Sequence, residues 1–119
     1  MWYYFFSHLG INSYALWNNK GGVGKSTISF HLSMRYAETH PNEKILVIDL
    51  CPQSNSSMML LGGGTVGDER VIELCSRAVP KSVVGYVSTV ITNGRGAKLP
   101  NPHDFLVHVK ANAFAGPSN

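Results

Sequence analysis

Cysteine, charge and long apolar runs are all scarce in this chain of 119 residues. Its two cysteines, Cys51 and Cys75, lie too far apart for a CxxC pair, which excludes a metal knuckle or disulfide scaffold and favours a reducing, cytoplasmic setting. No continuous apolar run reaches the ~18 residues of a membrane helix, so no membrane partner is expected. Apolar residues still make up 44% of the sequence, which is typical of one soluble folded domain and not of a disordered chain.

Charge of either sign is limited, since 10 Lys and Arg against 7 Asp and Glu give a net charge of +3. A balance this small permits contact with phosphates or nucleic acid without indicating it. Residues 1–12 precede the first predicted strand and are too few for a helix-turn-helix. Non-specific DNA therefore has no support as a partner here, and the scattered basic residues are expected on a solvated surface: Lys81, Arg95, Lys98 and Lys110.

The chain begins with an aromatic run. Residues 2–6 read WYYFF and hold five of the twelve aromatic residues. A secretory signal would have a positive start, a longer apolar core and a small-residue cleavage site, and none is visible. We interpret residues 1–12 as an aromatic N-terminal arm, packed or frayed, with an interaction surface or a shallow membrane contact as the alternative.

A strand, loop, helix and second strand are predicted between residues 13 and 50. Residues 13–18 are short, apolar and aromatic, as expected for a buried strand. Residues 26–39 carry two apolar lines at helical spacing. Residues 44–50, KILVIDL, form the continuous run typical of a parallel strand buried on both faces. Together the segments predict a βαβ unit.

Two further helices are predicted beyond residue 56. The first is expected to open at about residue 67 with Asp68 as its cap, and to end before Pro80. Residues 82–92 fit helical spacing, although their β-branched content would also suit a strand. We favour a helix that Ser82 caps and Gly94 ends.

The most informative segment is the glycine-rich loop between the first strand and helix, residues 20–27, KGGVGKST. Its glycines allow backbone angles closed to other residues, so that successive N–H groups can point at phosphate oxygens beside the positive end of the helix dipole. Lys25 is expected to reach the β and γ phosphates of a bound nucleotide, Ser26 to ligate Mg²⁺, and Thr27 to contact the α phosphate. The predicted cofactor-binding residues are Lys20, Gly21, Gly22, Val23, Gly24, Lys25, Ser26 and Thr27.

The loop departs from the standard Walker A motif, because Asn19 stands where that motif has its first glycine. With a second lysine before the paired glycines, K-G-G-V-G-K-S-T resembles the deviant Walker A motif of the ParA/MinD ATPase family. The hydrophobic strand followed by Asp49, Pro52, Gln53 and Asn55 is similar to that family's D-x-D-P-Q-x-N element. Its Pro-Gln-x-Asn form points to the ParA/Soj-like partition branch.

The resemblance implies a role for each matched residue. Lys20 would reach across a nucleotide-sandwiched homodimer and neutralise charge during phosphoryl transfer, while Lys25 would act within its own subunit. These two lysines are the predicted catalytic residues, and a solvated loop lysine is the alternative for Lys20. Asp49 would bind Mg²⁺ through water, together with Ser26. Cys51 replaces the family's second Asp, and a thiol is a poor substitute for a carboxylate that orients the attacking water, so slow or absent hydrolysis is expected.

The resemblance also implies a fold: an α/β, P-loop NTPase-type three-layer α/β/α domain with parallel strands. No Walker B strand follows residue 56, so residues 13–119 are expected to be the N-terminal part of a ParA-like domain. The implied function is a MgATP-binding ATPase that dimerises with ATP in DNA, plasmid or cargo partitioning, with a partition adaptor as a further partner.

Other classes of function compete with this one. A non-hydrolysing nucleotide-binding remnant or truncated fragment is the main alternative, since Cys51 and the missing Walker B strand both weigh against turnover. A small P-loop kinase would leave Lys20 without a role. A nitrogenase-like iron carrier would need cluster cysteines, which have no counterpart here.

Overall fold

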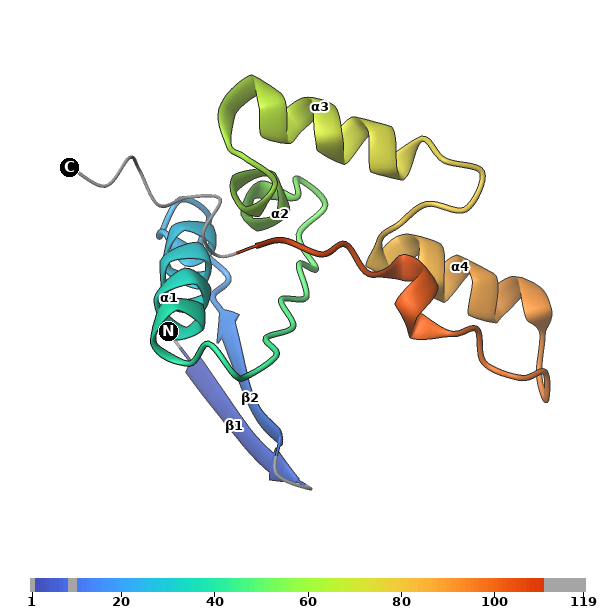
Figure 1. Ribbon diagram of the computed structural model, residues 1–119. Coiled ribbons are helices and arrows are strands. Elements are labelled where there is room, and N and C mark those ends of the chain that lie inside the picture. Colours follow the sequence, from blue (N-terminus) through green and yellow to red (C-terminus); the bar gives the residue numbers. More distant parts are fainter. Residues whose placement is uncertain (1, 9–10, 111–119) are drawn as a thin grey trace.

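The computed structural model describes the backbone of residues 2–8 and the backbone and side chains of residues 11–110. The elements are strands β1 (Trp2–His8) and β2 (Ile11–Trp17), helices α1 (Lys25–Thr39), α2 (Asn55–Leu60), α3 (Gly64–Cys75) and α4 (Val83–Asn93), and the 3₁₀ helix η1 (Pro102–Phe105). In Figure 1 the hairpin and α1 stand together on one side, while α3, α4 and η1 extend away on the other. The described residues are therefore mostly helical, with one hairpin beside the first helix.

Strands β1 and β2 pair antiparallel, with Trp2 opposite Trp17 and His8 opposite Ile11. The strand predicted at residues 13–18 is confirmed, with bounds shifted to Ile11–Trp17. Its neighbour is β1, because an antiparallel pair needs only a short connection whereas a parallel pair needs a long crossover. The aromatic run of the expected N-terminal arm is rich in residues that favour strands, and as β1 it pairs with β2.

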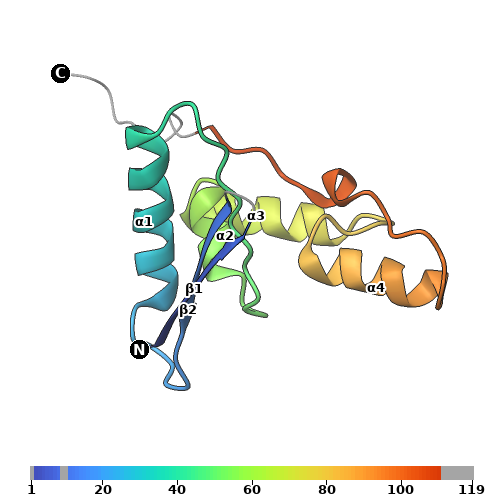
Figure 2. The same cartoon turned by 90° about the horizontal axis from the view of Figure 1, so that it is seen from below.

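The parallel strand predicted at residues 44–50 does not form, and the described residues contain no parallel sheet. The segment does run in the same direction as β2, with α1 between them in the chain, as a βαβ unit requires (Figures 1 and 2). A strand of this kind is stable when both of its faces are covered. Here Leu46, Ile48 and Leu50 are 64%, 59% and 77% exposed, so nothing holds the segment in a ladder.

The predicted helices all form, with one wrong boundary. Helix α4 begins and ends as expected: the Ser82 hydroxyl oxygen accepts from the Gly85 N–H at 3.1 Å, and Gly94 with φ 80° follows the last turn. Asp68, however, caps nothing, because α3 already begins at Gly64 and Asp68 lies in its second turn. Glycines 62–64 all adopt positive φ, which turns the chain into the helix earlier than expected.

Helices α2 and α3 form a tight helical hairpin. At the end of α2 the Gly63 N–H donates to the Met58 carbonyl at 3.0 Å and the Gly62 N–H to the Met59 carbonyl at 3.4 Å, which is the Schellman pattern. In α3 the buried Gly67 lies so close to Met58 that a Cβ atom would overlap its carbonyl oxygen. The two helices are thus locked at a fixed separation.

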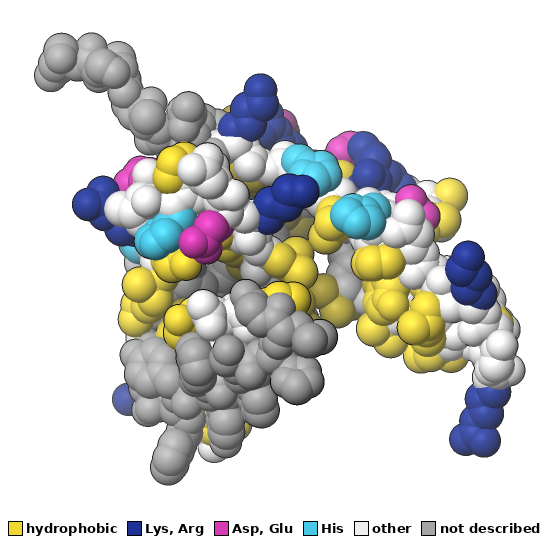
Figure 3. All heavy atoms as spheres, turned by 60° about the horizontal axis from the view of Figure 1, so that its bottom comes forward, with side chains coloured by type: hydrophobic (Ala, Val, Ile, Leu, Met, Phe, Trp, Pro, Cys, Tyr) yellow, Lys and Arg dark blue, Asp and Glu magenta, His cyan; other side chains and the backbone are white. Residues whose placement is uncertain are grey.

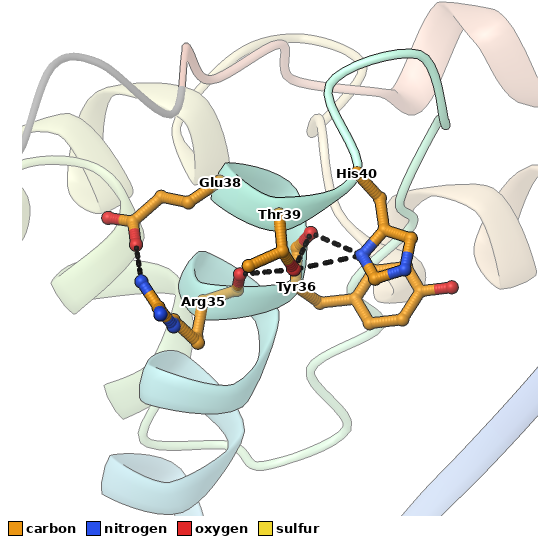
Figure 4. A network of polar contacts seen from close by, with 5 residues as sticks. All are labelled: Arg35, Tyr36, Glu38, Thr39 and His40. Carbon is orange, nitrogen blue, oxygen red and sulfur yellow. Dashed lines mark hydrogen bonds and ion pairs between the residues drawn. The ribbon is translucent and has the colours of Figure 1, made fainter.

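A polar network ends helix α1 (Figure 4). The His40 ring stacks on the Tyr36 ring at a centroid distance of 3.9 Å, and the His40 N–H donates to the Tyr36 carbonyl. His40 Nδ1 lies 3.1 Å from that same carbonyl oxygen. Thr39 Oγ1 lies 2.9 Å from Nδ1, and Arg35 pairs with Glu38 at 3.2 Å.

Apolar side chains are open to solvent across residues 11–110, where no hydrophobic side chain is buried. Figure 3 shows such side chains gathered on one face, with histidines and charged residues along its border. The most exposed include Tyr14, Val84 and Ile91, at 71%, 73% and 73%. Local hydrogen bonds, caps and helix-to-helix contacts therefore define the described elements, in place of a closed core.

The close approach of α2 and α3 predicts a specific defect. Gly67→Ala should lower the free energy of unfolding by about 1–3 kcal/mol, because the added methyl group must push the Met58 backbone away. Urea denaturation measures the change. Gly21→Ala is the matched control, since that glycine has open space around it, and equal stability of the two variants would contradict the packing.

The end of α1 predicts a pH effect. The pKa of Tyr36 is raised above its ordinary value because its hydroxyl donates to Glu43 Oε2 at 2.9 Å, with desolvation and the nearby carboxylate charge adding to the effect. The bond's stabilisation is present below pH 10.0 and is lost as the pH rises through the raised pKa. Glu43→Gln should move the pKa of Tyr36 back down in a ¹³C NMR titration of the ring, and an unmoved pKa would contradict this contact.

Candidate functional site

The glycine-rich loop connects β2 to α1 with its backbone open. Gly22 has φ 69° and Gly24 has φ 81° and ψ 13°, so both adopt the left-handed conformation that favours glycine. At Gly21, Gly22 and Gly24 no atom beyond the adjacent residues lies within 4 Å of where a Cβ would stand. The loop thus leaves free space along its backbone, as a cradle for phosphate oxygens requires.

Helix α1 starts at Lys25, directly after this loop. The first intrahelical bond of the turn runs from the Ile28 N–H to the Gly24 carbonyl at 2.9 Å. The N–H groups of Lys25, Ser26 and Thr27 precede it, and no side chain caps this end of the helix. The first turn contains no acidic residue, so the positive end of the helix dipole faces the loop without a competing carboxylate.

The two lysines of the loop lie at its opposite ends and are linked. Lys25 Nζ donates to the Lys20 carbonyl oxygen at 3.1 Å, so the Lys25 side chain folds back along the loop. The Lys20 N–H donates to Asn18 Oδ1 at 2.9 Å, in a turn that holds the loop's entrance. Lys20 itself is exposed. The ammonium of Lys25 is thereby held beside the backbone of the loop.

Asp49 is next to last in the 44–50 segment, and its carboxylate accepts three hydrogen bonds. Its Oδ1 accepts from the Cys51 N–H at 3.0 Å, and its Oδ2 accepts from the Ser57 N–H at 3.0 Å and the Ser57 hydroxyl at 3.1 Å. Ser57 belongs to the first turn of α2, so the carboxylate caps that helix from outside it. No hydrogen bond or ion pair joins Asp49 to Ser26 or Lys25 in residues 11–110.

The residues between Asp49 and α2 form a tight turn. The Ser54 N–H donates to the Cys51 carbonyl at 2.9 Å, and Ser54 adopts φ 52°, the one non-glycine residue with positive φ in the described ranges. Asn55 Nδ2 donates to Gln53 Oε1 at 3.3 Å. The Cys51 thiol is free and exposed. The Cys51 backbone N–H thus donates to Asp49, while its side chain forms no disulfide.

The donor atoms suit the group that the loop pattern implies. Mg²⁺ prefers hard oxygen ligands and retains several waters. Asp49 supplies a carboxylate with about four acceptor positions, of which three are filled, so one on Oδ1 remains for a metal-bound water. Ser26, half-buried at the start of α1, carries the other oxygen that the loop pattern predicts for Mg²⁺. In the described ranges, no group of three His, Cys, Asp or Glu side chains could hold a metal ion.

Ser57 is the site residue that the sequence did not reveal. It stands eight residues after Asp49 and outside the D-x-D-P-Q-x-N resemblance. The available signal was the polar run Asn55-Ser56-Ser57 before the apolar MMLL, which is typical of a helix start. That signal indicates a cap without saying which carboxylate makes it.

Comparison with known proteins identifies the family. A family model described as an AAA domain matches residues 12–98, so the chain belongs to this ParA/MinD-type P-loop family. An uncharacterized protein of Methanocaldococcus jannaschii, MJECL24, is 53% identical over 45 residues. That match covers 38% of this chain and 17% of the relative, so the chain spans less than a fifth of that protein. No solved structure matches the chain.

Family membership makes this a domain of the ATPase type, with nucleotide binding implied. The described residues form one β-hairpin and a set of helices, which is only part of the family's P-loop fold. None of the helices in residues 11–110 is long and apolar enough to cross a membrane.

Proposed function

We propose that this chain binds MgATP at residues 20–27, as a ParA-like ATPase domain that dimerises with nucleotide in the partitioning of DNA or another cargo. The observation that carries the proposal is the glycine loop, whose left-handed Gly22 and Gly24 lead an open backbone into the uncapped start of α1. An anion at such a position meets several N–H donors and the positive end of a helix at once. Family membership supports ATP as the source of that anion.

The proposed roles follow the chemistry of each side chain. Lys25, held along the loop by the Lys20 carbonyl, would exchange that neutral acceptor for phosphate oxygens, which bind an ammonium more strongly. Ser26 and Asp49 would hold Mg²⁺, which supplies charge neutralisation at the phosphates when bound. Lys20 is exposed, so its ammonium is accessible to a second copy's nucleotide in a homodimer.

The cellular side of the proposal follows from the family alone. Partition ATPases act in the cytoplasm with an adaptor protein. A cytoplasmic location and an adaptor partner are therefore part of the proposed function. Non-specific DNA has no separate support, since the basic residues Lys81, Arg95 and Lys98 are spread over different segments.

Nucleotide titration tests the proposal. In the presence of Mg²⁺, ATP at about 100 times its dissociation constant should stabilise the folded chain by roughly 2.7 kcal/mol, read as a thermal shift. Size-exclusion mass should rise with ATP if the dimer forms. Lys25→Ala should abolish both effects, while Lys98→Ala, an exposed lysine outside the loop, should change neither. A wild-type chain that gains no stability from ATP would contradict the proposal.

A second candidate function, nucleotide binding without turnover, is favoured by Cys51. Its thiol is exposed next to Asp49, where a carboxylate would be needed to orient the attacking water. Cys51→Asp should therefore raise ATP turnover by on the order of 10²-fold, measured as phosphate release. Cys75→Asp, at the other exposed cysteine, in α3, is the control and should have no effect. Wild-type turnover as fast as that of Cys51→Asp would rule this candidate out.

A further inference from the structure

The contact between Asp49 and Ser57 joins two different parts of the chain, the 44–50 segment and helix α2. Asp49 lies near the end of the 44–50 segment, which runs in the same direction as β2 (Figure 1), and Ser57 lies in α2. Ser57 offers both its N–H and its hydroxyl to the same oxygen, Oδ2, at 3.0 and 3.1 Å. Two donors on one oxygen fix the rotation of the carboxylate as well as its position. Both residues are half-buried, so water competes less for these bonds than at the surface.

The geometry divides the two carboxylate oxygens between two roles. Oδ2 is filled by Ser57, whereas Oδ1 accepts only the Cys51 N–H and retains one acceptor position. A carboxylate that turned freely would present either oxygen. With Ser57 in place, the open position stays on Oδ1.

Ser57 is itself held firmly. The Schellman bonds at the end of α2, and the contact of Gly67 with the Met58 backbone, fix α2 against α3. Arg70 Nη1 in α3 donates to the Leu61 carbonyl at 2.8 Å across the same turn. The neighbouring Ser56 is 6% exposed, the one buried polar side chain of residues 11–110. A donor on a rigid helical hairpin is a precise support for a functional side chain.

We propose that Ser57 is a positioning residue for Asp49: its two donors fix Oδ2, so that the open acceptor position on Oδ1 is the one that would hold a Mg²⁺-bound water. The inference rests on the proposed MgATP site and adds to it a residue outside the loop and outside the family motif. The Mg²⁺-dependent part of ATP affinity then depends on Ser57, whereas the metal-free part depends on the glycine loop alone.

Calorimetric titration with ATP, once with Mg²⁺ and once with EDTA, tests this division on the full chain. Ser57→Ala should weaken binding by roughly 10-fold with Mg²⁺, the effect of losing a hydrogen bond to a charged group, and leave binding in EDTA unchanged. Ser57→Thr keeps the hydroxyl and should restore the wild-type value. Ser76→Ala is the matched control, because the Ser76 hydroxyl donates to a helix carbonyl, that of Ile72, away from the site.

A double variant separates positioning from a loss of folding. Asp49→Asn should show the same Mg²⁺-specific weakening, and Asp49→Asn with Ser57→Ala should be no weaker than Asp49→Asn alone, because the serine acts through the carboxylate. Additive losses in the double variant would overturn the inference. Equal weakening by Ser57→Ala with and without Mg²⁺ would also overturn it, since a merely structural role affects both conditions alike.

The outcomes for the two proposals are distinct. If wild type binds ATP and Ser57→Ala binds MgATP equally well, the positioning role is wrong and the proposed function stands. If wild type binds ATP in neither condition, the proposed function itself fails, and the positioning role fails with it.

Discussion

The chain reversal at the glycine loop is the constraint on which the other features depend. Because Gly22 and Gly24 adopt left-handed conformations, β2 can end and α1 can begin within a few residues, with the helix running back alongside the strand. Any residue with a Cβ would be strained at these two positions. The reversal sets where the first turn of α1 lies, and therefore where Lys25 and Ser26 stand. It also determines that the segment after α1 returns in the direction of β2 (Figure 2).

A carboxylate sets the second reversal. Asp49 stops the returning segment by bonding to Cys51 and Ser57, and so directs the chain into α2. From there the α2–α3 hairpin is closed by its own glycines and leaves α3 and α4 extended from the first half of the chain (Figure 1). The two reversals use opposite chemistry: the first offers backbone donors to an anion, and the second satisfies a carboxylate with donors. Under the proposed function, the first reversal is the phosphate-binding part and the second carries the carboxylate proposed for Mg²⁺.

The sequence predicted local structure well and the sheet poorly. Helix α1, the Ser82 cap and the Gly94 end of α4 follow from spacing and capping rules that act within a few residues. The strand predicted at residues 44–50 does not form. A parallel strand needs neighbouring strands and cover on both faces, and a hydrophobic sequence pattern alone supplies neither. Asp68 was misplaced as a cap because consecutive glycines start α3 earlier. At the site, the pattern of residues 20–27 predicted the glycine loop. The Asp49–Ser57 contact depends on the turn at residues 51–54, which the spacing of hydrophobic residues does not predict.

The central claim is that the backbone of residues 20–27 receives the phosphates of a nucleotide. The most direct measurement is a two-dimensional ¹H–¹⁵N NMR titration of the labelled chain with ATP and Mg²⁺, which reports each backbone amide separately. We predict saturable shifts that are largest at the amides of Gly21 to Thr27, with smaller shifts at Cys51 and Ser57, whose N–H groups bind Asp49. Amides of the loop that stay unmoved at saturating ATP would contradict the claim, wherever else in the chain shifts occur.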